Sequence, residues 1–180
     1  MARHAAFLRG VNLGRQRRVS GAELREIFEA IGFADVATFR TSGNVVFDAG
    51  RETAKALAAR IERELARALG YEVAVFLRSA RELRSIAAQQ PYPAAVVESS
   101  QGKLQVMLLS TPPRKRAADD VLALATDEDR LAFGDRELYW LPSGGMRDAA
   151  LDLAAVKRSV GPTTMRTKGT IELLAAKYFD

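Results

Sequence analysis

Apolar residues recur along the chain with two different periods, and these periods predict where its helices and strands lie. A spacing of four residues is typical of the buried face of a helix, and it is followed by Leu57, Ile61, Leu65 and Leu69. A spacing of two residues is typical of one face of a strand, and Val73, Val75 and Leu77 follow it within residues 72–78. Ser20 and Glu23 form a capping box that predicts the start of another helix, which Gly32 ends.

The order of the predicted elements in the first half indicates a ferredoxin-like unit. Strands are expected near residues 5–9, 36–40, 45–47 and 72–78, with helices near residues 20–31 and 52–69. This strand–helix–strand–strand–helix–strand order is typical of a βαββαβ unit, whose two helices cover one face of an antiparallel sheet. The predicted fold class is therefore α+β.

The second half repeats most of this order. Strands are expected at 104–109, 130–133 and 137–141, with helices at 115–125 and 149–160, but no clear final strand follows. We therefore expect an architectural duplication, without a convincing residue-level repeat. The expected division is a ferredoxin-like half, residues 1–79, and a second α+β half, residues 80–180, with an incomplete repeat and C-terminal helices. We expect the two halves to pack as one unit.

Two polar, glycine-containing segments adjoin apolar runs, and they read Arg9-Gly10-Val11-Asn12-Leu13-Gly14 and Ser42-Gly43-Asn44-Val45-Val46-Phe47. The first segment together with Leu8, and the second together with residues 32–38, resemble two motifs of a bacterial family, domain of unknown function 1697. Its members carry L-R-G-[IV]-N-[VL]-G and, after a helix, G-F-x-D-V-x-T-x-x-x-S-G-N-V-V-F. The resemblance covers roughly the first 80 residues, and two motifs at a matching separation are specific. It implies a ferredoxin-like fold and names no activity, cofactor or catalytic residue.

The loop that begins at Arg9 is the first candidate site. Its successive backbone N–H groups, together with the Arg9 guanidinium, would cradle a phosphate or a carboxylate. In the structural alternative, Gly10 and Gly14 only turn the chain, and Asn12 ties the loop through side-chain-to-backbone hydrogen bonds. The loop lacks the sequence of a P-loop and that of a dinucleotide-binding turn.

Ser42 and Asn44 lie in a predicted hairpin, and turn chemistry is the first interpretation of both residues. We expect this hairpin at the opposite end of the sheet from the Arg9 loop, which argues against one shared site. Ser42 as a nucleophile would need a nearby base, and His4 is the only histidine. Asn44 remains a second candidate for ligand contact.

Composition and charge favour some partners over others. A net charge of +5, with basic clusters at residues 15–18 and 114–116, favours an anionic partner, although these side chains also solubilise a surface. A weaker similarity to the family over residues 163–166 adds Arg166 as an electrostatic contributor. Because the chain has no cysteine and no apolar run approaching ~20 residues, we expect a cytoplasmic protein without membrane contact.

Three functions stay open at this point. The leading hypothesis is a small-anion or nucleotide-binding module that uses the loop from Arg9 to Gly14. The alternative is a nucleic-acid-binding protein that uses its basic loops, with an affinity that falls steeply as salt rises. A third is an enzyme acting on a phosphorylated or acidic substrate, for which no base is identifiable. A homodimer through edge strands is also open. The sequence leaves any cofactor unknown, and its ligand types are too few for a zinc or iron site.

Overall fold

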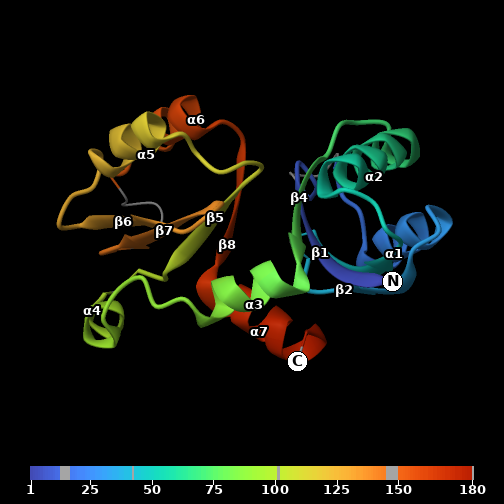
Figure 1. The fold of residues 1–180 in the computed structure, drawn as a ribbon, viewed down its shortest axis with the longest axis horizontal. Coiled ribbons are helices and arrows are strands. Elements are labelled where there is room, and N and C mark those ends of the chain that lie inside the picture. The colour runs from blue at the N-terminus through green and yellow to red at the C-terminus, as the bar shows by residue number, and fades with distance from the viewer. Residues whose placement is uncertain (13–16, 42, 101, 145–149, 180) are drawn as a thin grey trace. The chain divides into compact units, whose positions relative to one another are not determined.

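Two compact units divide the chain in a computed structural model. The first unit comprises Met1–Arg84 with Ala176–Asp180, and the second comprises Ser85–Ala175. The chain passes between the units inside two helices, α3 (Ala80–Ala88) and α7 (Lys168–Tyr178), both visible in Figure 1. The structure describes residues 1–12, 17–41, 43–100, 102–144 and 150–179.

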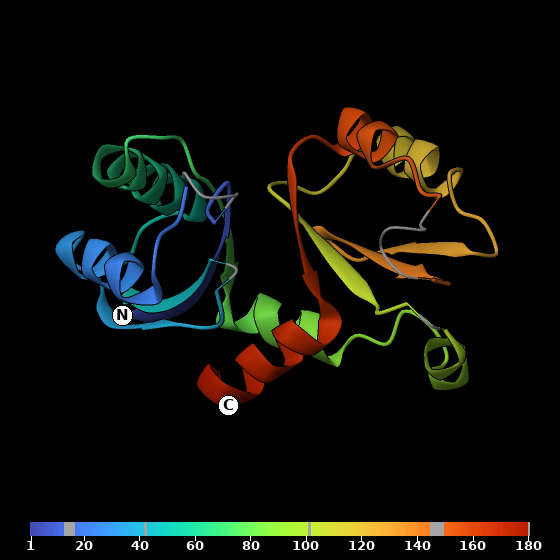
Figure 2. The same ribbon diagram turned by 180° about the vertical axis from the view of Figure 1, so that it is seen from behind.

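The first unit is a complete ferredoxin-like βαββαβ unit, as predicted. Its elements are β1 (Ala2–Arg9), α1 (Gly21–Ala30), β2 (Ala34–Thr38), β3 (Asn44–Ala49), α2 (Ala54–Leu69) and β4 (Ala74–Ser79). The strands form an antiparallel sheet in the order β2-β3-β1-β4. Helices α1 and α2 cover the same face of this sheet in Figures 1 and 2.

Local sequence explains where the helices of the first unit begin and end. Ser20 caps α1, and Glu23 completes the predicted capping box by accepting from the Ser20 backbone. Thr53 caps α2, and Gly70 ends it in a left-handed conformation. Three of the residues of α2 that were predicted to face the core, Leu57, Ile61 and Leu65, are buried, and the fourth, Leu69, is partly buried; this packing holds the helix in place.

The second unit has the same topology. After α4 (Ala94–Ser99) it contains β5 (Gln105–Leu109), α5 (Lys115–Leu122), β6 (Asp129–Phe133), β7 (Glu137–Pro142), α6 (Leu153–Val160) and β8 (Thr163–Thr167). Its sheet order, β6-β7-β5-β8, matches that of the first unit strand for strand. The predicted duplication is confirmed.

The expectation that the second half lacks a final strand is wrong, because β8 completes its sheet. Its sequence, TTMRT, contains one apolar residue, so the alternation of burial does not show as an alternation of hydrophobicity. Thr164 and Arg166 are buried polar residues of this strand. A strand whose buried positions are polar escapes a prediction that rests on apolar periodicity.

Among the residues that the structure describes, no helix has the length and apolar character needed to cross a membrane.

Candidate functional site

The two motifs of the sequence meet at one end of the first sheet. Strands β1 and β3 are antiparallel neighbours, and Phe7 pairs with Asn44, so the end of β1 lies beside the start of β3. The Leu8 N–H donates to the Gly43 carbonyl over 2.7 Å. The expectation that the loop and the hairpin project from opposite ends is therefore wrong, because the strand that follows the hairpin pairs directly with β1. We call residues 9–12, 17–19, 39–41 and 43–44, all of which the structure describes, the motif edge.

Asn12 fastens the loop to the hairpin. Its Nδ2 donates to the Thr41 carbonyl over 2.6 Å, and its Oδ1 accepts from the Val19 N–H over 2.9 Å. The Asn12 N–H donates to the Arg17 carbonyl, and its φ of +57° is one that asparagine tolerates better than most residues. Because both ends of its amide are engaged within the protein, Asn12 holds the two loops of the motif edge together.

Asn44 closes the hairpin. It is only 1% exposed, and its Nδ2 donates to the Phe39 carbonyl over 2.9 Å. Gly43 next to it has a φ of +71°, and a Cβ there would lie 2.6 Å from Val11 Cγ2 and 3.0 Å from Leu8 Cβ. Glycine is therefore required at position 43 for two reasons, its backbone conformation and the close approach of the β1 loop.

Arg9 is the candidate residue that remains available to a ligand. It is the last residue of β1 and is half-buried. Among the described residues, its guanidinium has no hydrogen-bond or ion-pair partner. Gly10 follows with a φ of +96°, a conformation that favours glycine, and a Cβ at this position would lie 3.4 Å from the Glu72 carbonyl oxygen.

Two more arginines lie at the motif edge, each stacked on an aromatic ring. The Arg17 guanidinium lies 5.1 Å from the centre of the Tyr71 ring, and that of Arg40 lies 5.4 Å from the Phe39 ring. Arg40 has a φ of +58°, which few residues without a short polar side chain adopt. Such backbone strain is found more often at ligand-binding positions than elsewhere. The motif edge therefore carries positive charge on both of its loops.

The other predicted residues fall elsewhere. Gly14 and Ser42 lie outside the described residues. Arg166 belongs to the second unit, where it is 9% exposed and its Nη1 donates to Thr164 Oγ1 and to the Met165 carbonyl. Burial lowers the pKa of Arg166 to about 10. An arginine buried to this degree is part of the structure of its own unit.

Arg78 is the counterpart of Arg166, and sequence reasoning missed it. It pairs with Ala5 of β1 as Arg166 pairs with Val106 of β5, and it is fully buried. Each arginine donates from Nη1 to the carbonyl of the preceding residue over 2.8 Å. The next residue of each, Ser79 or Thr167, accepts from the N–H three positions later. A residue-level repeat thus exists, and the signal for it was an arginine followed by a hydroxyl residue at the end of the fourth strand of each unit.

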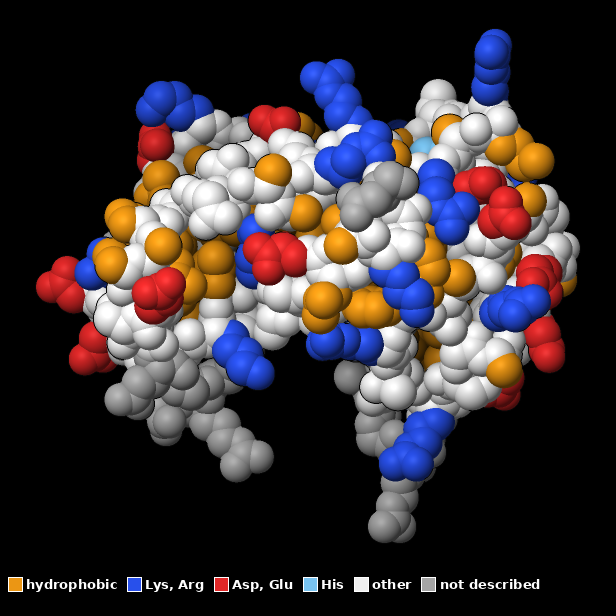
Figure 3. All heavy atoms as spheres, turned by 90° about the horizontal axis from the view of Figure 1, so that it is seen from below, with side chains coloured by type: hydrophobic (Ala, Val, Ile, Leu, Met, Phe, Trp, Pro, Cys, Tyr) orange, Lys and Arg blue, Asp and Glu red, His pale blue; other side chains and the backbone are white. Residues whose placement is uncertain are grey.

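Four aromatic residues of the two sheets are buried and are not available to stack on bases, whereas Phe39 and Phe133 are half-buried. Phe7 and Phe47 are fully buried in the first unit, and Tyr139 and Trp140 are buried in the second. Trp140 Nε1 donates to Asp129 over 2.7 Å. On the face drawn in Figure 3, Lys and Arg side chains are scattered among acidic and apolar ones and do not gather in a single patch. Neither observation favours recognition of RNA by stacking.

Comparisons with known proteins support the fold and leave the activity open. The family described as "Protein of unknown function (DUF1697)" matches residues 1–139. None of the curated proteins matches the chain. Among solved structures, the chain is similar to the conserved bacterial protein SP0830 from Streptococcus pneumoniae, with a TM-score of 0.79 and 19% identity over 100% of this chain and 99% of that one. At this identity the likeness concerns the fold alone.

Proposed function

The chain belongs to the DUF1697 family, whose description names no activity, and we propose that it is a small-anion-binding protein. The proposed ligand is a phosphate-bearing small molecule, such as a nucleotide, or a carboxylate. Its anionic group contacts the Arg9 guanidinium and the backbone near Gly10, at the motif edge. We also propose that the protein is located in the cytoplasm.

The observation that carries the proposal is the length of the connection after β1. The second unit joins the equivalent strand and helix, β5 and α5, through residues 110–114 alone. The first unit uses residues 10–20 for the same step. Since the same sheet order is reached with the shorter connection, the topology does not require the longer one. Loops that are longer than the fold requires often contain binding or catalytic residues.

The residues of the motif edge divide between positioning and contact. Asn12 and Asn44 engage their side chains inside the protein and hold the two loops against each other. Among the described residues the Arg9 guanidinium has no hydrogen-bond or ion-pair partner, and its half-buried position strengthens its attraction to an anion relative to a fully solvated cation. Arg17 and Arg40 add positive charge nearby. We propose binding and no reaction, since the described residues of this edge include no acid–base residue.

The test is calorimetric titration with pyrophosphate, AMP and ATP, on the native protein and on Arg9→Gln. Loss of a charge-assisted hydrogen bond weakens binding by about tenfold or more. Arg51→Gln is the matched control, because Arg51 is exposed and follows β3, at the other end of the sheet. We expect the affinity of Arg51→Gln to stay within about twofold of the native value.

Repeating the titration at low and high salt, with a short DNA and a short RNA added to the ligands, separates the alternatives. A small-anion site keeps a measurable affinity at high salt, whereas nucleic-acid binding falls by several powers of ten over the same range. Equal affinities of native protein and Arg9→Gln would overturn the proposal. Binding of nucleic acid alone, lost at high salt, would replace it with the nucleic-acid alternative.

A further inference from the structure

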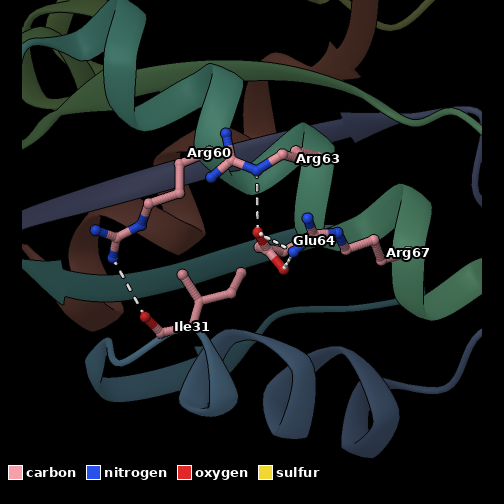
Figure 4. Close-up of polar contacts among 5 residues, drawn as sticks. All are labelled: Ile31, Arg60, Arg63, Glu64 and Arg67. Carbon is pink, nitrogen blue, oxygen red and sulfur yellow. Dashed lines mark hydrogen bonds and ion pairs between the residues drawn. The ribbon is translucent and has the colours of Figure 1, made fainter.

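A groove runs between the two helices of the first unit, apart from the motif edge. Its cavity volume is about 510 Å³. One wall is apolar and comes from α1 and the residue that follows it, namely Ile27, Ala30 and Ile31. The other wall is a row of arginines on α2, namely Arg60, Arg63 and Arg67. We call these six residues the helix groove, which Glu64 and Ala68 of α2 also line. Figure 4 shows Arg60 reaching from α2 to Ile31 at the end of α1, and Arg63 and Arg67 contacting Glu64.

One carboxylate organises two of the arginines. Glu64 accepts from Arg63 Nε over 3.1 Å and from Arg67 Nη1 over 3.2 Å. The pKa of Glu64 lies below its ordinary value, above all because of the hydrogen bond from Arg63, so Glu64 is ionised at neutral pH. Each guanidinium keeps further N–H groups that have no partner among the described residues. These donors stay available beside the groove.

Arg60 is fixed more tightly than its neighbours. Its Nη1 donates to Glu52 over 2.7 Å, and its Nη2 donates to the Ile31 carbonyl over 3.3 Å. Its guanidinium lies 4.8 Å from the centre of the Phe33 ring. Arg60 therefore links α2 to the end of α1 and shapes one end of the groove. Its charge is already balanced by Glu52.

Charge and surface chemistry together select a class of ligand. Arg63 and Arg67 share one carboxylate, so this part of the groove has one positive charge in excess. A single anionic group satisfies that excess and the remaining guanidinium donors. An inorganic ion would leave the apolar wall of Ile27, Ala30 and Ile31 in water, whereas a ligand with an apolar body covers it. The volume lies in the range of small-molecule sites.

We propose that the helix groove binds a small amphipathic monoanion, with its carboxylate on Arg63 and Arg67 and its apolar body against Ile27, Ala30 and Ile31. This site is separate from the motif edge and does not depend on Arg9. Surface arginines alone would attract any anion weakly, so the distinguishing property of the site is a preference for anions that carry an apolar chain.

The test is a titration of isotope-labelled protein with acetate, butanoate, hexanoate and octanoate at constant ionic strength, followed by amide chemical shifts. Affinity is expected to rise about fourfold for each methylene that the groove covers. The shifts are expected at Ile27, Ile31 and Arg63. Hexylammonium, which has an apolar chain with the opposite charge, is expected to leave these amides unchanged.

Two variants assign the effect to the arginine row. The double variant Arg63→Gln, Arg67→Gln is expected to bind hexanoate at least about tenfold more weakly. Arg25→Gln is the matched control, because Arg25 is exposed on α1, pairs with Glu29 and does not line the groove. Its affinity for hexanoate is expected to equal that of the native protein.

Three results would overturn the proposal. The first is an equal affinity for acetate and octanoate, which indicates ion pairing at the surface without a groove. The second is native affinity in the double variant. The third is a set of shifts confined to residues outside the groove. Because Arg9 is unchanged in every variant, none of these results bears on the motif edge, which the Arg9→Gln titration tests separately.

Discussion

The two units of the chain build the same sheet and connect its strands with loops of different length. In the first unit Leu8 N–H donates to Gly43, and in the second Leu109 N–H donates to Arg136, over 2.7 and 2.8 Å. These bonds join equivalent strands to equivalent hairpins. The hairpin itself spans residues 39–43 in the first unit and 134–136 in the second. The scaffold is therefore shared down to individual hydrogen bonds, while the loops on this end of it are not.

Each unit also ties its first loop to its hairpin with a side chain, and the ties differ in kind. In the second unit Arg136 Nη1 donates to the Ser110 carbonyl over 3.1 Å at an exposed site. In the first unit Asn12 makes two hydrogen bonds and adopts a left-handed backbone conformation. The Arg136 hydrogen bond spans the shorter loop from an exposed site. The comparison shows that, in the first unit, Asn12 holds in place a connection, residues 10–20, that is longer than the sheet order requires.

The largest expected effects concern the buried arginines that the units share. Arg78→Ala is expected to lower the free energy of unfolding by roughly 3–4 kcal/mol, because it opens a cavity and removes the hydrogen bond to the Leu77 carbonyl. Arg166→Ala is expected to cost less, about 2 kcal/mol, since Arg166 keeps some solvent contact. Urea denaturation measures both values.

Substitution by methionine separates packing from charge at these two positions. Methionine fills most of the volume of arginine without the cost of a buried charge, so Arg78→Met is expected to recover much of the lost stability. Because burial lowers the pKa of Arg166 to about 10, Arg166→Met is expected to be at least as stable as the native protein. If methionine destabilises as much as alanine, then the charge itself is needed, and the shared arginines are not mainly packing residues.

The next effect tests the difference between the two loop ties. Asn12→Ala is expected to cost roughly 2 kcal/mol, from two hydrogen bonds and from the strain of alanine at a φ of +57°. Asn12→Gly loses the same bonds without that strain and is expected to cost about 1 kcal/mol less. Arg136→Gln is the counterpart in the second unit, with an expected cost below about 1 kcal/mol. Equal costs for Asn12→Ala and Arg136→Gln would remove the distinction between the loops.

The smallest effect is a pH dependence that belongs to the first unit alone, because His4 is the only histidine. Burial lowers the pKa of His4 below its ordinary 6.5, with Glu82 and Asp48 partly opposing the shift. The folded protein therefore binds this proton more weakly than the unfolded chain does. Stability is expected to fall as the pH drops through 6.5, and the loss is complete below the pKa of the folded state.

His4→Gln removes this contribution, so the comparison is between the pH slopes of the two proteins and not between their absolute stabilities. The substitution also loses the contact of His4 with Phe47, whose ring centre lies 5.8 Å away, at every pH. Thermal unfolding between pH 7 and pH 5 measures the slopes. Identical slopes would show that His4 titrates alike in the folded and unfolded chain.

Much of the fold could be predicted because its signals are local. The capping box at Ser20 and the four-residue spacing in α2 each act within a few residues, and both hold in the structure. The final strand β8 could not be predicted in this way, because its buried positions hold Thr164 and Arg166. Its place in the sheet depends on pairing with β5, which is distant in sequence.

The candidate site, too, could be predicted only in part from the sequence. The two motifs could be found from residue types, since glycine, asparagine and arginine beside an apolar strand are visible in the sequence. Their meeting at one end of the sheet could not, and the expectation of opposite ends was wrong. The helix groove also escaped prediction, because its two walls come from helices separated by two strands.

By itself, the sequence determined the periods of burial, the helix caps, the family and the repeated order of elements, all of which depend on neighbouring residues. Only the tertiary structure decided that Asn12 binds Thr41, that Arg78 and Arg166 occupy equivalent buried positions, and that three arginines face an apolar wall. The physical reason is that hydrophobic periodicity fixes which face of an element is buried, whereas strand pairing across the chain fixes which polar side chains meet.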